Sequence, residues 1–554
     1  MRSSIAAVAA ILALSSTTTY AASARPVEPS IQTMQRLVKE LSSDAYEGRA
    51  PGSAGEEKTL ALLASEFGKL GLKPGNKGSW FQDVPLVEIT AKNVSALSFA
   101  GGKDSVTAAY GPEMVIGTYR TTQPRIDIRN SPVVFVGYGI NAPEKGWNDY
   151  AGLDVKGKTV VILVNDPDYE TQGLSGPFNG RAMTYYGRWT YKFEEAARQG
   201  AAAAIIVHDT VPAAYGWNVV QSSWTGSQHV ADSANGNADQ SQAIGWIQKD
   251  KAAALFASAG LNLDQQMSAA KQKGFKAVPL TGVTASVSFD NDLRKHSSKN
   301  VVALLPGKTR PDEYVLYSAH WDHLGHCQAA PDGDDICNGA VDNATGTAAL
   351  VALAQANVKA GPTDRSQVFL AVTAEESGLL GSAYYGNNPV FPFAKTVGGV
   401  NMDALSVAGL ARNVVVIGKG KSQLDAYLDR ALAAQGRVAS DEPTPEKGFY
   451  YRSDHFSFAK HGLPMLYFEG GEDLVNGGTA AGMAAAEDYT RNRYHGPKDE
   501  YDPNWDWKGI QADLKLYYAV GRDLATTKDW PNWVEGDEFR AIRDKDRSGD
   551  RAGK

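Results

Sequence analysis

The sequence predicts an α/β protein with a mixed, mostly parallel sheet covered by helices on both faces, and with a β-rich module inserted into the chain. From residue 300 to about 525, short apolar runs alternate with helical stretches, a pattern typical of parallel sheets buried on both faces. Between about 110 and 290, short apolar runs are separated by long loops rich in Gly, Asn, Ser and Trp. The length of 554 residues and the hydrophobic content of 43% are sufficient for two or three domains with full cores.

Residues 1–24 are predicted to be a signal peptide. Arg2 gives it a positive start, Ile5–Leu14 is an unbroken apolar run, and the small residues Ala22 and Ala24 follow at cleavage positions. The run is too short for a membrane span, which needs about 20 apolar residues. We therefore expect an exported protein, periplasmic or secreted, with no membrane span; the alternative interpretation is a buried N-terminal helix.

Residues 25–110 and 290–530 are expected to form one discontinuous α/β domain. Apolar residues at helical spacing extend from Ser30 to Leu72, interrupted by a turn at 47–56. Further helices are expected at Ala348–Lys359 and Leu424–Gln435. The candidate buried strands are, in order, Val301–Leu305, Tyr314–Tyr317, Val368–Ala374, Val397–Met402, Val414–Ile417 and Met465–Phe468.

Residues 111–289 are expected to form the inserted β-rich module, with one helix at Phe193–Gln199. Its candidate strands are Val133–Val136, Val160–Val164 and Ala203–Val207. The polar stretch Asp290–Lys299 is expected to be the linker that leaves the module. Residues 535–554, rich in Asp, Arg and Gly, are expected to be a disordered charged tail.

The cysteines and the net charge limit the compartment and the partners. Cys327 and Cys337 could close one small loop in an oxidising compartment; the alternative is two unrelated buried thiols. The formal net charge of -7 argues against a nucleic-acid partner, which needs a basic face. The sequence gives no prediction of the oligomeric state.

Chemically active side chains follow the second, third and fourth of the candidate strands of the α/β domain. These side chains are His320, the pair Glu375 and Glu376, and Asp403. In open α/β sheets, ligands bind just beyond the carboxyl ends of the strands. Packing does not explain this set, because buried carboxylates are costly unless they are paired or bound to metal.

Two further ligand types lie in loops. Asp342 precedes a predicted helix, and His495 lies in a segment rich in turn formers. With His320, Glu376 and Asp403 they make two imidazoles and three carboxylates, a mixture that suits zinc. If one carboxylate is shared, two ions about 3.5–4 Å apart can each hold one imidazole and a second acid, with a position left open for water.

Six segments resemble the successive active-site blocks of the dizinc exopeptidase family that contains the secreted bacterial leucine aminopeptidases and glutamate carboxypeptidase. They are YSAHWDHLG, DNATGTAAL, AEESGLLGS, NMDAL, RSDHFSFAKHGLP and YHGPKDEYD. The resemblance spans roughly 300–520 and the segment EGRAPGSAGEE near the N-terminus. The inserted module, with GKTVVILVND and GAAAAIIVHD, resembles the protease-associated domain that many members carry.

The resemblance implies a zinc exopeptidase fold that holds two Zn²⁺ ions per chain. Asp342 would bridge the ions. His320 and Asp403 would complete the shell of one ion, and Glu376 with His495 that of the other.

The resemblance also implies three catalytic residues outside the ligand set. Glu375 would be the general base that deprotonates the water. Asp322 would accept the other ring proton of His320 and orient it, and Tyr494 could donate a hydrogen bond to the oxyanion. His455 is a candidate for bordering the substrate pocket, whereas no ligand role is predicted for His323.

The implied function is hydrolysis of the terminal peptide bond of peptide substrates, with an aminopeptidase as the first hypothesis. A carboxypeptidase or dipeptidase of the same family would hold a substrate carboxylate, for which Arg452, Arg491 and Arg493 are candidates. A glutaminyl cyclase uses one zinc, and receptor-like relatives have lost ligands that are present here. No G-x-S-x-G or H-E-x-x-H motif occurs, so serine hydrolases and single-zinc endopeptidases lack their signature. By analogy, the module is expected to cover the cleft and limit it to short peptides.

Overall fold

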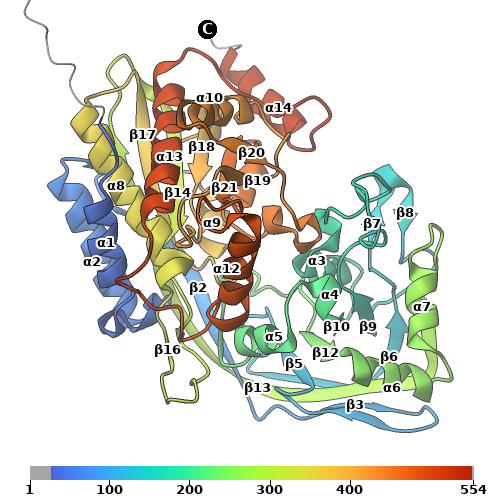
Figure 1. The fold of residues 1–554 in the computed structure, drawn as a ribbon. Helices are drawn as coiled ribbons and strands as arrows, with labels where there is room; N and C mark the ends of the chain where they lie inside the picture. Colours follow the sequence, from blue (N-terminus) through green and yellow to red (C-terminus); the bar gives the residue numbers. More distant parts are fainter. Residues whose placement is uncertain (1–26, 552–554) are drawn as a thin grey trace, which may run out of the picture.

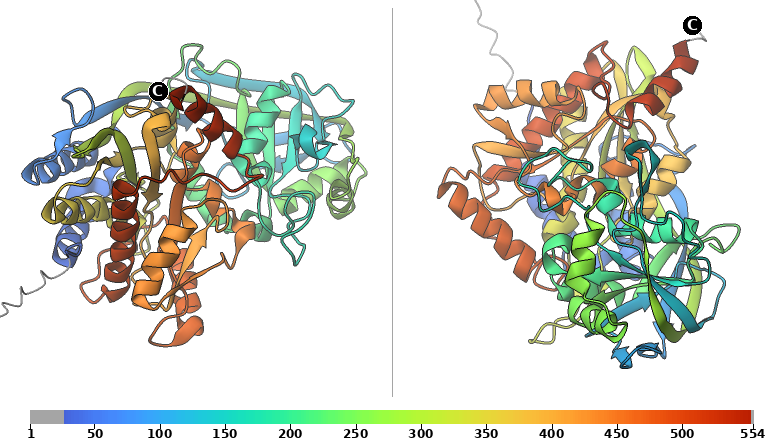
Figure 2. Two further views of the ribbon diagram at one scale, coloured as in Figure 1. Left: turned by 90° about the horizontal axis from the view of Figure 1, so that it is seen from above. Right: turned by 90° about the vertical axis from the view of Figure 1, so that its right-hand side faces the viewer.

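The computed structural model describes residues 27–551, so the predicted signal peptide lies outside the described residues. Two units lie side by side in the views of Figures 1 and 2: a main domain, built from residues 27–92 and 290–551, and an inserted module, built from residues 93–289. The long strand β13 (Val278–Leu305) runs through both of them. No helix within 27–551 combines the length and the hydropathy that a membrane span requires.

The main domain contains a mixed sheet in the order β1–β13–β17–β14–β18–β21–β19–β20. Its other strands are β1 (Lys73–Pro74), β17 (Arg365–Val372), β14 (Arg310–His320), β18 (Thr396–Asn401), β21 (Met465–Gly470), β19 (Asn413–Ile417) and β20 (Val438–Ser440). The four central strands β17, β14, β18 and β21 are parallel. Strand β13 is antiparallel to β17, and β19 is antiparallel to β21 but parallel to β20. This arrangement confirms the predicted α/β class.

Helices cover both faces of this sheet, as predicted (Figure 1). One face packs on α1 (Ile31–Leu41), α2 (Ala54–Lys69), α8 (Thr345–Ala360), α10 (Asp425–Gln435) and α13 (Lys508–Thr526). The other face packs on α9 (Leu380–Asn387) and α11 (His455–Ala459). Alternation along β17 supplies both cores, because Phe369 and Ala371 point to the first and Val368 and Leu370 to the second. The small residues of α8 let it lie buried against the sheet.

The inserted module has its own two hydrophobic cores. Its strands are β3 (Leu97–Ala100), β4 (Val106–Ala108), β5 (Met114–Gly117), β6 (Arg125–Phe135), β7 (Asn141–Ala142), β8 (Trp147–Asn148), β9 (Thr159–Leu163), β10 (Ala203–His208), β11 (Ser227–Ala231) and β12 (Ala243–Gln248). Its helices are α3 (Trp189–Arg198), α4 (Thr210–Ala213), α5 (Trp217–Trp224), α6 (Lys249–Ser258) and α7 (Leu263–Ala270). Leu97, Phe99 and Val106 pack in a module core, so the module begins before the predicted boundary at 111.

The segment predicted to be the exit linker is part of a strand. Residues 290–301 of β13 pair with β2 (Phe81–Lys92), from Asp290 opposite Lys92 to Val301 opposite Phe81. The polar composition suggested a linker because one face of this pairing, to which β11 adds a third strand beside β2, is exposed. Ile89 and Leu293 supply the apolar contacts of the other face.

The C-terminal segment also differs from its prediction. Residues predicted to form a disordered tail contain the helix α14 (Arg540–Arg551). Arg543, only 1% exposed, donates hydrogen bonds to the backbone oxygens of Phe393, Thr396 and Val397, which anchors the helix on the main domain. Charged residues thus supply the packing contacts that a sequence pattern assigns to apolar residues.

Cys327 and Cys337 form a disulfide bond. The bond closes the loop between the short strands β15 (Gly325–His326) and β16 (Ile336–Cys337). The sequence left open a disulfide-closed loop or two unrelated thiols, and the structure shows the disulfide-closed loop. The remaining long helix, α12 (Gly478–Asn492), lies largely exposed on the surface of the main domain (Figure 1).

Candidate metal centre

Three parallel strands carry ionisable side chains to one edge of the main sheet. Strand β14 ends at His320, Asp403 follows β18, and Glu376 follows β17. The Nε2 atom of His320 lies 3.1 Å from Oδ1 of Asp403 and 3.3 Å from Oδ1 of Asp342. These three residues form the first half of the centre.

A second half of the same kind lies beside the first. The Nε2 atom of His495 is 3.0 Å from Oε2 of Glu376 and 3.5 Å from Oδ2 of Asp342. The two carboxylate oxygens of Asp342 therefore face two different imidazoles. The structure brings together all five residues that the sequence predicted as ligands.

The Asp342 loop is held by a buried acid that the sequence analysis did not single out. Asp499 accepts hydrogen bonds from the backbone N–H groups of Val341 and Asp342, both at 3.0 Å. The hydroxyl of Tyr489 donates to the same carboxylate at 3.1 Å. Asp499 lies four residues after His495, so one segment supplies both a candidate ligand and the support of another.

Arg49, in the N-terminal segment EGRAPGSAGEE, supports the centre from behind. Its guanidinium is fully buried and donates hydrogen bonds to the backbone oxygens of Trp321, Asn338 and Gly339. The first of these residues follows His320, and the other two precede the Asp342 loop. Arg49 therefore fixes the loops that carry two of the candidate ligands.

Charges within the centre perturb one another strongly. Burial alone would raise the pKa of Glu376, but the imidazoles of His495 and His323 lower it to about 2. Burial would likewise raise the pKa of Asp342, which His320 and His495 hold well below its ordinary value. Burial opposes protonation of His320, yet the carboxylates of Asp403 and Glu375 raise its pKa well above its ordinary value. The surrounding imidazoles thus favour the charged form of Glu376 and Asp342, which a carboxylate needs to bind a metal.

The donor set and its spacing fit bound divalent cations. With zinc–ligand bonds of about 2.0–2.2 Å in a tetrahedral shell, two ligand atoms lie about 3.3 Å apart. The separations of 3.0–3.5 Å in the two halves are close to that value. Ligand atoms of His320, Asp342 and Asp403 lie within 4.8 Å of one another, as do those of His323, Asp342 and Glu376, and those of His320, Glu375 and Glu376. Nitrogen and oxygen donors in this ratio are suited to zinc.

Glu375 lies beside the centre and also lines the adjoining cleft. Burial raises its pKa well above the ordinary value; His320 opposes this effect and Glu376 adds to it. A carboxylate in this place can accept a proton from a water that the centre holds. The structure therefore places the predicted base beside one residue of each half, with ligand atoms of His320, Glu375 and Glu376 within 4.8 Å of one another.

Asp322 supports the centre differently from its prediction. Nδ1 of His320 lies 3.2 Å from the backbone oxygen of Asp322, whereas the Asp322 carboxylate is 3.8 Å away. That carboxylate instead accepts a hydrogen bond from the backbone N–H of Glu375 at 3.2 Å, with the N–H of Glu376 at 3.5 Å. Asp322 thus orients the imidazole through its main chain and the Glu375–Glu376 turn through its side chain.

Tyr494 stacks on His495, with ring centroids 3.9 Å apart, and lines the cleft. Its hydroxyl oxygen accepts a hydrogen bond from Arg452 at 3.3 Å. Because the oxygen accepts from Arg452, the hydroxyl proton is available to a group bound in the cleft. His455, by contrast, packs between the rings of Tyr450 and Tyr467 and does not appear among the cleft-lining residues described.

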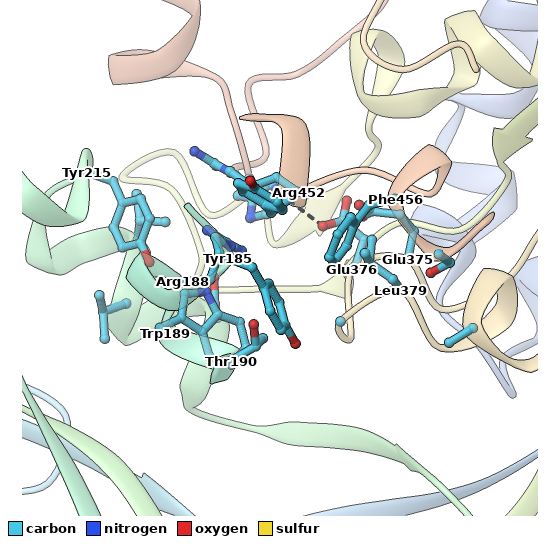
Figure 3. A pocket seen from close by; sticks show the side chains of 18 of the residues that line it. Tyr185, Arg188, Trp189, Thr190, Tyr215, Glu375, Glu376, Leu379, Arg452 and Phe456 are labelled. Carbon is cyan, nitrogen blue, oxygen red and sulfur yellow. Dashed lines mark ion pairs between the residues drawn. The ribbon is translucent and has the colours of Figure 1, made fainter. Parts of the chain in front are cut away.

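The cleft beside the centre lies between the two units and encloses about 1070 Å³, its open mouth included. Figure 3 shows Glu375, Glu376 and Arg452 of the main domain facing Arg188 and Tyr215 of the module. Other module residues of the lining include Tyr185, Trp189, Val219 and Trp224. The module thus forms one wall of the cleft. The sequence analysis expected the module to cover the cleft but named none of these lining residues.

Comparisons with known proteins agree with this geometry. Residues 300–519 match the sequence model of Peptidase family M28. Among curated proteins, "Aminopeptidase NAALADL1" of Mus musculus is 32% identical over 128 residues, which are 22% of this chain and 16% of the relative. The "Glutamate carboxypeptidase 2 homolog" of Caenorhabditis elegans is 29% identical over 132 residues, 23% of this chain and 16% of the relative. The chain therefore aligns with 16% of the length of each of these relatives.

A solved structure shares the fold over most of the chain. The aminopeptidase from Aneurinibacillus sp. strain AM-1 matches with a TM-score of 0.54 and 20% sequence identity, covering 91% of this chain and 96% of that one. The similarity extends over both the main domain and the inserted module, because it covers more residues than the main domain contains.

Proposed function

Because residues 300–519 match the sequence model of Peptidase family M28, we propose that this protein is an exported exopeptidase that uses two zinc ions to remove the N-terminal residue of peptides. The observation that carries the proposal is Asp342, whose two oxygens face His320 and His495 in the two halves of the metal centre. Glu375 beside the centre supplies the proton acceptor that such hydrolysis needs.

The mechanism assigns separate tasks to the side chains around the scissile bond. When bound, zinc ions polarise the substrate carbonyl and make a water more acidic. Glu375 takes the proton of the attacking water and returns it to the leaving amine. The hydroxyl of Tyr494 donates a hydrogen bond to the negative oxygen that develops on the carbonyl. Asp322 holds the Glu375–Glu376 turn in place through the two backbone N–H groups.

Export is supported by the disulfide bond between Cys327 and Cys337. Disulfide bonds form and persist in oxidising compartments, such as the periplasm or the extracellular medium. The apolar run Ile5–Leu14, which precedes the described residues, is the proposed signal sequence.

A carboxypeptidase or dipeptidase is the second candidate, because two arginines line the cleft. Arg188 of the module and Arg452 of the main domain both line it. Burial, together with the charge of Arg452, lowers the pKa of Arg188 to about 10. Nε of Arg188 has no hydrogen-bond partner among the described residues. Guanidinium groups bind carboxylates in a two-pronged geometry, so this wall suits a substrate with a free C-terminus close to the scissile bond.

The proposal is tested by metal content and by a peptide panel. The purified protein should contain about two zinc ions per chain, and a content below about one without reactivation by added zinc would contradict the proposal. Peptides with free, N-blocked or C-blocked ends then separate the two candidates. An aminopeptidase loses activity only on N-blocked peptides, whereas a carboxypeptidase loses it only on C-blocked ones.

The arginine wall has a direct test in Arg188→Gln. If Arg188 binds the C-terminal carboxylate, the KM for peptides with a free C-terminus should rise about 10–100-fold, since a hydrogen bond to a charged group contributes about 1.5–3 kcal/mol. The KM for C-amidated peptides should stay near its wild-type value. Arg493→Gln is the control, because Arg493 pairs with Asp488 outside the cleft lining.

A further inference from the structure

His323 is a histidine of the metal centre for which the sequence predicted no role. It lies three residues after His320, and its side chain is fully buried. Its Nδ1 atom is 2.5 Å from Oε1 of Glu376. The other oxygen of the same carboxylate, Oε2, faces His495 at 3.0 Å. The two oxygens of Glu376 are therefore divided between two imidazoles.

The distances distinguish a hydrogen bond from shared metal binding. Two ligand atoms on one tetrahedral zinc ion lie about 3.3 Å apart. The separation between His495 and Glu376 is close to this value, but the 2.5 Å between His323 and Glu376 is far too short. A hydrogen bond to a charged carboxylate has a length of about 2.7–2.9 Å, which is nearer to the observed separation. His323 therefore contacts Glu376 as a hydrogen-bond donor rather than as a second ligand.

The ring of His323 lies close to the backbone of Gly339. Gly339 has a positive φ of 54°, and a Cβ atom there would lie 2.5 Å from Cγ of His323. The ring also packs edge-on against His495, with centroids 5.8 Å apart and an interplanar angle of 77°. His326, three residues further along, instead points outward with 59% of its side chain exposed. The ring of His323 is thus confined next to the centre.

We propose that His323 is a positioning residue of the metal centre, whose Nδ1–H holds Oε1 of Glu376 so that Oε2 is the oxygen presented to the metal. This inference rests on the proposed zinc function. Without the bond, rotation of the Glu376 carboxylate would let both oxygens approach one ion, which changes the number of ligands around it. Hydrogen bonds to ligating carboxylates of this kind contribute about 10–100-fold to metal affinity.

The experiment compares His323→Asn with His323→Gln in the full-length protein. The side-chain nitrogen of Asn falls near the position of Nδ1 and that of Gln near the position of Nε2. His323→Gln should therefore weaken one of the two zinc sites by about 10–100-fold, and His323→Asn by no more than about threefold. Zinc affinity is measured by competition with a chelator, and the ligand field of the site by the visible spectrum of the Co²⁺-substituted protein. His326→Gln is the matched control, and its zinc affinity should equal that of the wild type.

Three results separate the inference from the function on which it rests. Wild-type zinc affinity in His323→Gln would overturn the role of His323 alone. Equal losses in His323→Asn and His323→Gln would overturn the assignment of the hydrogen bond to Nδ1. Failure of the wild-type protein to bind zinc would overturn the proposed function and this inference together. Unfolding temperatures of the metal-free wild type, His323→Asn and His323→Gln identify any variant that fails to fold. The zinc affinity of the other variant is then compared with that of the wild type.

Discussion

The two units each bury a cluster of charged side chains, and the clusters differ in whether a buried lysine faces the acids. In the module, Lys192 is fully buried and donates hydrogen bonds to the backbone oxygens of Tyr138 and Asn165, at 2.6 and 3.1 Å. Asp166 nearby is equally buried and accepts hydrogen bonds from the N–H and the hydroxyl of Thr184. Burial raises the pKa of Asp166 and lowers that of Lys192, and each charge opposes the shift of the other.

The metal centre of the main domain has more acids than bases. Three imidazoles lie there among five carboxylates; the imidazoles are His320, His323 and His495, and the carboxylates Asp322, Asp342, Glu375, Glu376 and Asp403. The cation Arg49 lies behind the loops and donates to backbone oxygens rather than to these acids. A buried charge is costly when no opposite charge lies nearby, so a buried cluster with a larger excess of acids favours binding of a cation.

The largest effect is expected from a substitution in the metal centre. Glu375→Gln should lower kcat about 10²–10⁴-fold, because it removes the proton acceptor, and should leave the zinc content unchanged. Steady-state rates and metal analysis on the same preparation check this. A variant that keeps its rate would show that another group accepts the proton, and one that loses zinc would show that Glu375 is a ligand.

A smaller effect is expected when the buried cation of the module is removed. Lys192→Met leaves Asp166 buried without its cation, which should cost about 3–5 kcal/mol of the free energy of unfolding. The double variant Lys192→Met with Asp166→Asn should recover part of this loss, since it removes both charges. Urea unfolding of the three proteins measures the difference, and a double variant no more stable than Lys192→Met alone would contradict the pairing.

The smallest effect concerns a neutral histidine close to the centre. Burial lowers the pKa of His455 to about 3, since the ring is fully buried between Tyr450 and Tyr467. The unfolded state, with a pKa of about 6.5, therefore binds the proton more tightly. The resulting stability is present above about pH 6.5 and is lost at about 1.4 kcal/mol per pH unit as the pH falls toward 3.

His455→Phe should remove this dependence. The free energy of unfolding of the chelated protein is measured between pH 7.5 and pH 5. It should fall less steeply with decreasing pH in the variant than in the wild type, by a difference that approaches one bound proton. His326→Asn, on the surface, serves as the control. Equal slopes in His455→Phe and the wild type would mean that His455 is protonated in the folded protein.

Much of the fold could be predicted because apolar patterns identify buried strands. Each of the six strands expected in the α/β domain overlaps a strand of the structure, from β13 to β21. The pattern failed where packing depends on charged residues. Arg543 is buried by hydrogen bonds to backbone oxygens, so α14 carries no apolar stripe that sequence periodicity could detect. The β2–β13 pairing was missed for a similar reason, because its exposed face is polar.

The site could be predicted only as far as strand order determines it. Parallel strands end at the same edge, so the meeting of His320, Glu376 and Asp403 followed from the order of the elements. His323 was missed because its partner Glu376 is 53 positions away and its role depends on one distance. Arg188 was missed because its place in the cleft depends on how the module lies against the main domain.

The pairing of β2 with β13 also marks the place where the module could be exchanged, with β11 as the strand of the module that pairs with β2. Lys92 lies directly opposite Asp290, so a two-residue Asn-Gly turn could join them and replace residues 93–289 by a hairpin. The two largest cores of the main domain, as far as the described residues go, draw on no residue between those positions. Modules from related chains could be grafted at the same pair of positions, which would give the same metal centre a new wall and a new range of substrates.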